Sequence, residues 1–332
     1  MPRDIITRVT TRLMLLDTAS LYFRAYFGVP DSVQAPDGTP VNAVRGLLDF
    51  ISRLVSTYEP TDLVCCWDDD WRPAWRVDLI PSYKAHRVVA ARPAGVDVEV
   101  TPDPLETQVP IIRKVLGALG VAVLGARDYE ADDIIGTLTA RATGPVDIVT
   151  GDRDLFQLVS DDRQVRVLYT ARGVGNLEVV TDGVVARKYG VLPEQYVDFA
   201  VLRGDPSDGL PGVKGIGDKT AAGLLQQYGD LSGIRDVALD PTSGLGASLR
   251  GKLVDASDYL DVAPMVVQVA CDVELDKVPT KIGDLDVEAR AAVEALAETW
   301  GLGSAAQRVM AALDPAKPAA DVSADSRGGV ST

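Results

Sequence analysis

The chain has 332 residues, of which 46% are hydrophobic, and its formal net charge at pH 7 is -15. This length and apolar content suffice for a sizeable core in one or two domains, while the excess of acids argues against a nucleic-acid partner unless basic residues gather locally. One histidine and three cysteines argue against a Cys/His zinc cluster and against a histidine-based catalytic triad.

Short apolar runs alternate with longer segments of helical spacing in the first half of the chain. The runs typical of strands are 12–16, 62–67, 121–125 and 146–150, and the helical segments between them are 42–58 and 105–120. The adjacent Cys65 and Cys66 fall within the second run, and we interpret them as buried strand residues. Strands that alternate with helices predict an α/β domain, with a mostly parallel central sheet and helices on both faces.

An aspartate stands at the carboxyl end of three of these predicted strands. Asp17 follows the first run, Asp68 the second and Asp152 the fourth. The carboxyl ends of strands in an open parallel sheet face one crevice, where ligands bind. We therefore expect these three carboxylates to lie close together.

One segment of the acidic chain is basic and rich in aromatic residues. It spans 71–93 and contains, against the single acid Asp78, the side chains of Trp71, Arg72, Trp75, Arg76, Tyr83, Lys84, Arg87 and Arg92. Basic residues interleaved with aromatic ones are typical of nucleic-acid contacts, which predicts that Arg72, Arg76 and Tyr83 bind DNA. A solvated basic helix face is the alternative interpretation for Arg72, Arg76 and Arg92.

Further acids stand at the start of a predicted helix at 129–142 and in two later turns. Glu130, Asp132 and Asp133 precede the apolar face of that helix; three acids exceed what a helix cap needs, although complementing the helix dipole is the alternative. With the two later turns, the candidate set of carboxylates is Asp17, Asp68, Glu130, Asp132, Asp133, Asp152, Asp154, Asp205 and Asp208. Like charges in one crevice repel unless cations neutralise them. Oxygen ligands of this kind suit Mg2+ or Mn2+, and two such ions are the usual device for phosphodiester hydrolysis.

A glycine-rich turn with two lysines follows the last two acids. Its glycines lead into a helix that begins near Asp218. Backbone amides beside glycine approach phosphates closely, and a helix N-terminus attracts anions. The predicted phosphate contacts are Gly212, Lys214, Gly215, Gly217, Lys219 and Thr220. A G-x-G turn followed by a lysine and a helix indicates a helix-hairpin-helix element, which grips a duplex without reading its sequence.

Several motifs of the chain together resemble one known family. They are, in order, "LLDTASLYFRAYFG", "YKAHR", "EADD", "GDRDLFQL" and "GDPSDGLPGVKGIGDKTA". The chain resembles the bacterial 5'-3' exonuclease and flap endonuclease family, which also forms the N-terminal nuclease domain of DNA polymerase I. The resemblance implies a PIN-like nuclease core with a helical arch, and a C-terminal helical region with a helix-hairpin-helix-type element. It implies metal-dependent cleavage of branched or nicked DNA with a 5' flap or 5' end, including RNA-containing 5' strands, in replication and repair.

The resemblance also assigns metal ligands by matching position. Around the first metal it places Asp17, Asp68, Glu130 and Asp132, and around the second Asp152, Asp154, Asp205 and Asp208, with Asp133 in support. It gives Asp132 the bridging place. The carbonyls around Gly215 to Gly217 would hold a potassium ion.

Further residues match the family's substrate contacts. Lys84 and Arg87 would stabilise charge on the scissile phosphate and, with Asp132 and Asp152, form the predicted catalytic set. Phe23 would stack on a base near the cut. Arg24 would contact a phosphate.

The sequence predicts three parts of the chain. They are a nuclease core at 1–180 with the arch at about 71–110, a helical duplex-binding region at 181–315 with its DNA-binding element at about 203–230, and a disordered tail at 316–332. We expect a free-standing, monomeric, cytoplasmic nuclease without membrane association, because no polymerase domain, secretory signal or long apolar run is present. The segment 88–108 is longer than in many relatives and ends in acids, so we expect an arch that is either more mobile or of different shape.

Two functions from other classes compete with this interpretation. An aspartyl phosphatase would share a strand-end aspartate and Mg2+, but it normally has a second acid two residues later, where Ala19 stands. A non-catalytic DNA-binding module would explain the glycine turn and the basic segment. It would leave the nine carboxylates unexplained.

Overall fold

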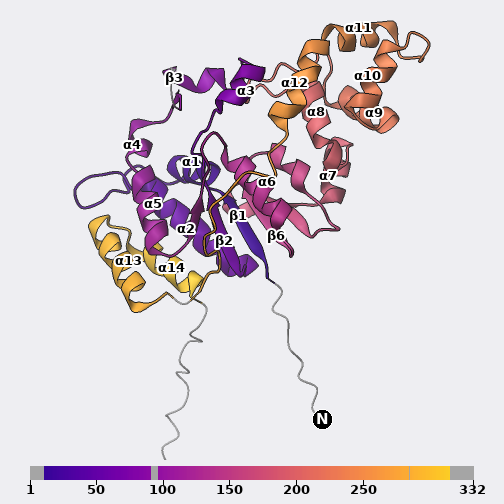
Figure 1. The fold of residues 1–332 in the computed structure, drawn as a ribbon. Helices are drawn as coiled ribbons and strands as arrows, with labels where there is room; N and C mark the ends of the chain where they lie inside the picture. The colour runs from indigo at the N-terminus through magenta and orange to yellow at the C-terminus, as the bar shows by residue number, and fades with distance from the viewer. Residues whose placement is uncertain (1–10, 91–95, 284, 315–332) are drawn as a thin grey trace, which may run out of the picture.

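The computed structural model describes residues 11–90, 96–283 and 285–314, and a six-stranded sheet lies at its centre (Figure 1). In spatial order the strands are β5 (Ala122–Leu124), β2 (Asp62–Cys66), β1 (Leu13–Asp17), β6 (Val146–Thr150), β7 (Val165–Tyr169) and β8 (Glu178–Val180). All neighbouring strands are parallel except β7 and β8. The predicted mostly parallel sheet is confirmed. The sequence did not reveal β7, because the short 3-10 helix η2 (Asp154–Leu158) lies between it and β6 and no α-helix marks the crossover.

Helices cover both faces of this sheet, as predicted. Leu16 and Cys65 point to the face covered by α1 (Thr18–Gly28), α2 (Asn42–Tyr58) and α5 (Val109–Ala118). Leu15 and Cys66 point to the opposite face, against α6 (Ala131–Arg141). Successive strand residues face opposite sides, so the two adjacent cysteines enter two different cores, and both are fully buried as expected.

The helix predicted at 105–120 is broken into α4 (Asp103–Glu106) and α5. Gln108 lies between the two pieces and is completely buried. Its side-chain oxygen accepts hydrogen bonds from the amides of Ala43 and Val44, at 2.8 and 3.3 Å. Free amides at a helix start need acceptors, so the break places an acceptor at the N-terminus of α2.

The predicted helical arch is only partly helical in the described residues. The helices α3 (Ala74–Leu79) and η1 (Ala85–Arg87) are followed by an antiparallel pair of short strands, β3 (Val88–Ala90) and β4 (Val98–Glu99). The β-branched valines in both strands favour this extended pairing over a helix. Arg92, between the two strands, lies outside the described residues.

The chain after residue 181 is helical, as predicted. Its elements are α7 (Asp182–Tyr189), η4 (Pro193–Gln195), α8 (Tyr196–Arg203), α9 (Asp218–Tyr228), α10 (Leu231–Leu239), α11 (Ala247–Asp255) and α12 (Ser257–Val267). These elements extend from one end of the sheet. Within this helical region, α9 to α11 lie farthest from the sheet (Figure 1). No helix in the described ranges is long and apolar enough to cross a membrane.

The last two helices return to the nuclease core. The helix α13 (Val287–Thr299) lies beside α5, and α14 (Gly303–Leu313) lies beside α2 (Figure 1). Their buried residues share one core cluster with the inner face of α2. The predicted region 181–315 is therefore divided in the structure, because its last helices complete the core. The predicted disordered tail, 316–332, lies outside the described residues.

Candidate active site

Three neighbouring strands deliver the strand-end acids to one place. In the register of the sheet, Asp17 lies beside Cys66, at the ends of β1 and β2. Asp68 follows β2 by two residues, and Asp152 follows β6, the other neighbour of β1. All three carboxylates line a single cavity of about 700 Å³. The convergence predicted from the strand ends is present.

Local hydrogen bonds fix the orientation of these acids. Asp17 is the N-cap of α1, and its carboxylate accepts from the amide of Ser20 at 3.1 Å and from the hydroxyl of Thr150 at 2.7 Å. Asp68 accepts from the amide of Ala131, in the first turn of α6, at 2.8 Å. Asp17 and Asp68 therefore accept hydrogen bonds from amides at helix starts and line the cavity at the same time, so capping a helix and belonging to the site are compatible roles.

The cavity joins most, but not all, of the predicted catalytic and metal-binding residues, and one predicted DNA-binding residue, Phe23. The predicted residues that line it are Asp17, Phe23, Asp68, Lys84, Arg87, Glu130, Asp132, Asp152 and Asp205. Asp208 lies at its edge, where its carboxylate is paired with Arg87 at 3.0 Å. Residues from the sheet edge, the arch segment and the helical region thus meet at one cavity.

Burial and mutual repulsion raise the pKa values of several acids of the cavity wall. Burial, together with repulsion from Asp68, raises the pKa of Asp17 to about 7. Burial raises the pKa of Glu130 to about 7 against the attraction of Lys84. Burial and the charge of Asp152 raise the pKa of Asp132. Such a cluster is costly to ionise by itself and attracts cations.

Asp154 lies next to this cavity and supplies an unsatisfied oxygen. Its Oδ1 atom is buried and has no hydrogen-bond partner in the described part of the chain. Burial and repulsion from Asp152 raise the pKa of Asp154. A buried carboxylate oxygen without a donor is expensive, so it fits a cationic ligand.

The donor set fits hydrated divalent ions better than a closed metal cage. Within the described ranges, no group of three or more His, Cys, Asp or Glu side chains is arranged to hold a metal ion by itself. Mg2+ keeps several waters and takes one or two carboxylates together with substrate phosphates. A wide cavity with many carboxylates at its wall matches that mode of binding.

Two cations of the arch segment, Lys84 and Arg87, stand beside the carboxylates, and Arg153, which follows Asp152, also lines the cavity. The ammonium of Lys84 lies 2.7 Å from Glu130, and Arg87 donates to the carbonyl of Ser207 at 2.8 Å. The amide of Lys84 also donates to the carbonyl of Asp208 at 2.9 Å. The arch segment is thereby attached to the turn that carries the last two acids.

Four predictions for the arch segment and α6 are corrected by the structure. Arg76 is 2% exposed and forms a two-bond ion pair with Asp133, which is 0% exposed. The hydroxyl of Tyr83, 4% exposed, donates to Glu130. Arg72 pairs with Asp97 and donates to two backbone carbonyls. None of these four residues lines the cavity, and Arg76, Tyr83 and Asp133 are buried, so the structure does not support DNA binding by Arg72, Arg76 and Tyr83 or metal binding by Asp133.

The predicted phosphate-binding turn lies between α8 and α9. Lys214, Lys219 and Thr220 are exposed, and Gly217 is the N-cap of α9. Gly212, at φ +63°, packs against the backbone of Gly204 instead, where a side chain would collide. Its role in the turn is therefore close packing.

The carbonyl of Gly215, a predicted potassium ligand, already has a partner. It accepts a hydrogen bond from the ammonium of Lys252, in α11, at 3.2 Å. A monovalent cation at this turn would share that carbonyl with a positive side chain.

Sequence reasoning missed part of the cavity wall. Tyr22, which also packs against the core, lines the cavity and stacks on Phe23 with ring centroids 5.3 Å apart. Trp67 and Trp71 also line it, as does Glu99 from β4. The aromatic residues beside the predicted site were the available signal. Arg24 does not line the cavity, and its Nε is buried without a partner within the described residues.

Comparisons with known proteins agree with this architecture. The family model "5'-3' exonuclease, N-terminal resolvase-like domain" matches residues 12–190, and "5'-3' exonuclease, C-terminal SAM fold" matches 191–290. A 5'-3' exonuclease of Streptomyces coelicolor is 63% identical over 300 residues, covering 90% of this chain and 99% of that protein. A 5'-3' exonuclease of Mycobacterium tuberculosis is 47% identical over 315 residues, covering 91% of this chain and 98% of that protein.

A solved structure shares the fold. The flap endonuclease of bacteriophage T5, in a complex with DNA and metal ions, superposes with a TM-score of 0.59 at 17% identity and covers 91% of this chain and 99% of the phage chain. At that identity the likeness concerns the fold, whereas the sequence matches over nearly the whole chain concern the family. The chain therefore belongs to the 5'-3' exonuclease family, whose members are nucleases that hydrolyse DNA phosphodiester bonds.

Proposed function

We propose that the protein is a structure-specific 5' nuclease that removes 5' flaps and 5' ends from branched or nicked DNA, RNA-containing strands included, as a monomer. One observation carries this proposal. The same cavity that gathers carboxylates from three strand ends also contains Lys84 and Arg87, so it offers ligands for cations and donors for a phosphate. The T5 flap endonuclease, whose fold the chain shares, was solved with DNA and metal ions.

The carboxylates are proposed to hold two divalent ions. Asp17, Asp68, Glu130 and Asp132 would hold one, and Asp152, Asp154, Asp205 and Asp208 the other. Mg2+ and Mn2+ are the candidates because the donors are hard oxygens. Bound ions of this kind lower the pKa of a water and neutralise phosphate charge.

The chain's own cations would act on the reacting phosphate. Lys84 and Arg87 extend from the arch segment into a cavity whose other wall is acidic. A positive group fixed in a partly buried site is worth more to a developing negative charge than the same group in water. Both side chains are paired with acids, so they are held in place before the substrate arrives.

Duplex DNA is proposed to bind at the turn before α9. The exposed Lys214 and Lys219 and the N-terminus of α9, which has no side-chain cap in the described residues, would form a phosphate-binding surface. This surface is joined to the cavity through Arg203, in the last turn of α8, which lies 3.3 Å from Asp205 and 4.0 Å from Asp218, at the start of α9. The Arg203 side chain thus connects the proposed phosphate-binding surface to the cavity.

The test is cleavage of a 5'-labelled double-flap DNA by the purified protein at low salt. The reactions contain Mg2+, Mn2+ or EDTA, and single-stranded DNA and a blunt duplex serve as substrate controls. We expect release of the flap near the branch with either metal and none in EDTA. Binding of the flap without cleavage under any of these conditions would support a non-catalytic DNA-binding module instead.

Potassium and the Lys252 ammonium are proposed to compete for the carbonyl of Gly215. Both are positive, and they would repel each other at that distance. We expect Lys252→Met to lower, several-fold, the potassium concentration that half-maximally promotes duplex binding. Fluorescence anisotropy in KCl and in NaCl of equal ionic strength measures this. The same potassium dependence in both proteins, or none in either, would contradict the competition.

A further inference from the structure

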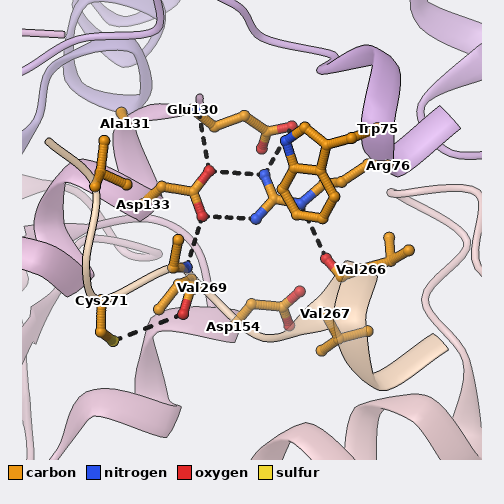
Figure 2. Close-up of polar contacts among 12 residues, drawn as sticks. Trp75, Arg76, Glu130, Ala131, Asp133, Asp154, Val266, Val267, Val269 and Cys271 are labelled. Atoms are coloured by element: carbon orange, nitrogen blue, oxygen red, sulfur yellow. Dashed lines mark hydrogen bonds and ion pairs between the residues drawn. The ribbon is translucent and has the colours of Figure 1, made fainter. Parts of the chain in front are cut away.

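A buried ion pair connects three distant segments beside the cavity (Figure 2). Arg76 of α3 donates to both carboxylate oxygens of Asp133 in α6, at 2.7 and 2.9 Å. The same guanidinium donates to the carbonyl of Val266, in α12, at 3.1 Å. Asp133 in turn accepts from the amide of Ala270 at 2.8 Å. The arch base, the start of α6 and the chain after α12 are thereby held together.

The pair also reaches a carboxylate of the cavity wall. The guanidinium of Arg76 lies 3.5 Å from Glu130, and Asp133 accepts from the amide of Glu130 at 3.1 Å. Asp133 thereby satisfies a backbone amide at the N-terminus of α6. Asp132, another cavity residue, lies between Glu130 and Asp133 in the sequence. The orientation of Asp133 therefore bears directly on where Glu130 and Asp132 point.

Because the ion pair is buried, the loss of either of its members is costly. Arg76 is 2% and Asp133 0% exposed, and the ring of Trp75 lies over the guanidinium, 4.5 Å from its centre. Removing one member would leave the other charge unpaired where water does not reach it, which is strongly unfavourable. The first turn of α6 would then have to shift to find another partner or water.

We propose that Arg76 is a positioning residue for the metal-binding carboxylates. It supports Glu130 directly and, through Asp133, fixes the first turn of α6, from which Glu130 and Asp132 line the cavity. Arg76 itself touches neither DNA nor metal. This inference rests on the proposed function, because it assumes that Glu130 and Asp132 bind the ions.

The test measures metal binding without DNA, so that activity is not the readout. Mn2+ is titrated into the full chain, and the loss of the free Mn2+ signal in electron paramagnetic resonance gives its dissociation constant. We expect Arg76→Met to weaken Mn2+ binding about tenfold, the usual effect of removing a residue that orients a ligand. Arg76→Lys should give an intermediate loss, because it keeps the charge without the two parallel hydrogen bonds.

A double variant tests whether the effect of Arg76→Met comes from the unpaired charge that it leaves on Asp133. Arg76→Met combined with Asp133→Asn removes both charges and leaves none unpaired. We expect it to bind Mn2+ more tightly than Arg76→Met alone. If Arg76→Met does not fold, the Mn2+ affinity of Arg76→Lys is the test.

Arg166→Met is the matched control. Arg166 also donates two hydrogen bonds to a fully buried aspartate, Asp147, at 2.7 and 3.2 Å, but Asp147 belongs to β6 and does not line the cavity. We expect a lower melting temperature with unchanged Mn2+ affinity. Asp147 keeps Arg12 as a second partner, so the loss of stability should be smaller than for Arg76→Met.

The outcomes distinguish this inference from the proposed function. Unchanged Mn2+ affinity in Arg76→Met, in a wild-type protein that binds Mn2+ and cuts flaps, would overturn the positioning role alone. An equal loss of affinity in Arg166→Met would overturn it too, because the effect would then follow from lost stability. A wild-type protein that binds no Mn2+ and cuts no flap would overturn both.

Discussion

Replacing Asp152 by asparagine is expected to reduce flap cleavage by at least about a hundredfold, because loss of a direct metal ligand should exceed the effect of losing a residue that only orients one. The same change is expected to raise the melting temperature of the metal-free protein. Burial and repulsion from Asp208 and Asp205 raise the pKa of Asp152, so its charged form is disfavoured in the fold. Asparagine removes that charge and can still accept from the amide of Asp154, now 2.9 Å away.

Two assays of the same protein preparation check both halves of this prediction. Single-turnover flap cleavage with Mg2+ measures the activity, and thermal unfolding in EDTA at pH 8 measures the stability. Asp31→Asn is the control, since Asp31 is an exposed acid that does not line the cavity, and it should change neither quantity. If Asp152→Asn cuts at the wild-type rate, the two-metal assignment is wrong. A lower melting temperature in EDTA would contradict the role of charge crowding.

Replacing Lys84 by methionine is expected to slow cleavage at saturating DNA by about 10²–10³-fold, the usual cost of removing one donor that stabilises developing charge. Binding of flap DNA without divalent metal should change little, because Lys84 is largely buried and lies beside Glu130 rather than on the duplex-binding surface. Lys84→Arg should not restore the rate. The wider, planar guanidinium does not fit where a compact ammonium lies against Glu130 and the carbonyl of Trp71.

Lys214→Met is the matched comparison for Lys84→Met. Lys214 is exposed in the turn before α9, so we expect weaker DNA binding with an unchanged rate at saturating DNA. The slope of log binding constant against log salt concentration should fall by about 0.9, the value for one phosphate contact. Anisotropy titrations over a range of salt and single-turnover rates measure both. A Lys84→Met protein that loses affinity instead of rate would place Lys84 among the binding residues.

Local sequence patterns determined the frame of this site. Apolar runs that end in aspartate located β1, β2 and β6, and parallel strands necessarily place their carboxyl ends at one edge. The spacing of apolar residues likewise located α2, and the glycine-rich turn located the start of α9. These features could be predicted because they depend on residues that are close together in the chain, or on a rule that holds for every parallel sheet.

The roles of neighbouring or similar residues were decided by the tertiary structure. Asp132 and Asp133 are adjacent acids at a helix start, yet Asp132 lines the cavity while Asp133 is buried with Arg76. Arg76 and Arg87 belong to one basic segment, yet Arg87 alone of the two reaches the cavity.

Residues of the same type differ in role because the sequence shows that a side chain is charged but not which residue it pairs with in the fold. Arg76 is buried between α6, which supplies Asp133, and α12, which supplies the carbonyl of Val266. Val266 lies 190 residues further along the chain than Arg76. In the same way, α13 and α14 join the core because their apolar residues pack against α5 and α2, which lie far earlier in the chain. The sequence by itself determined which chemical groups stand at the ends of the strands, and only long-range packing decided which of them face the cavity.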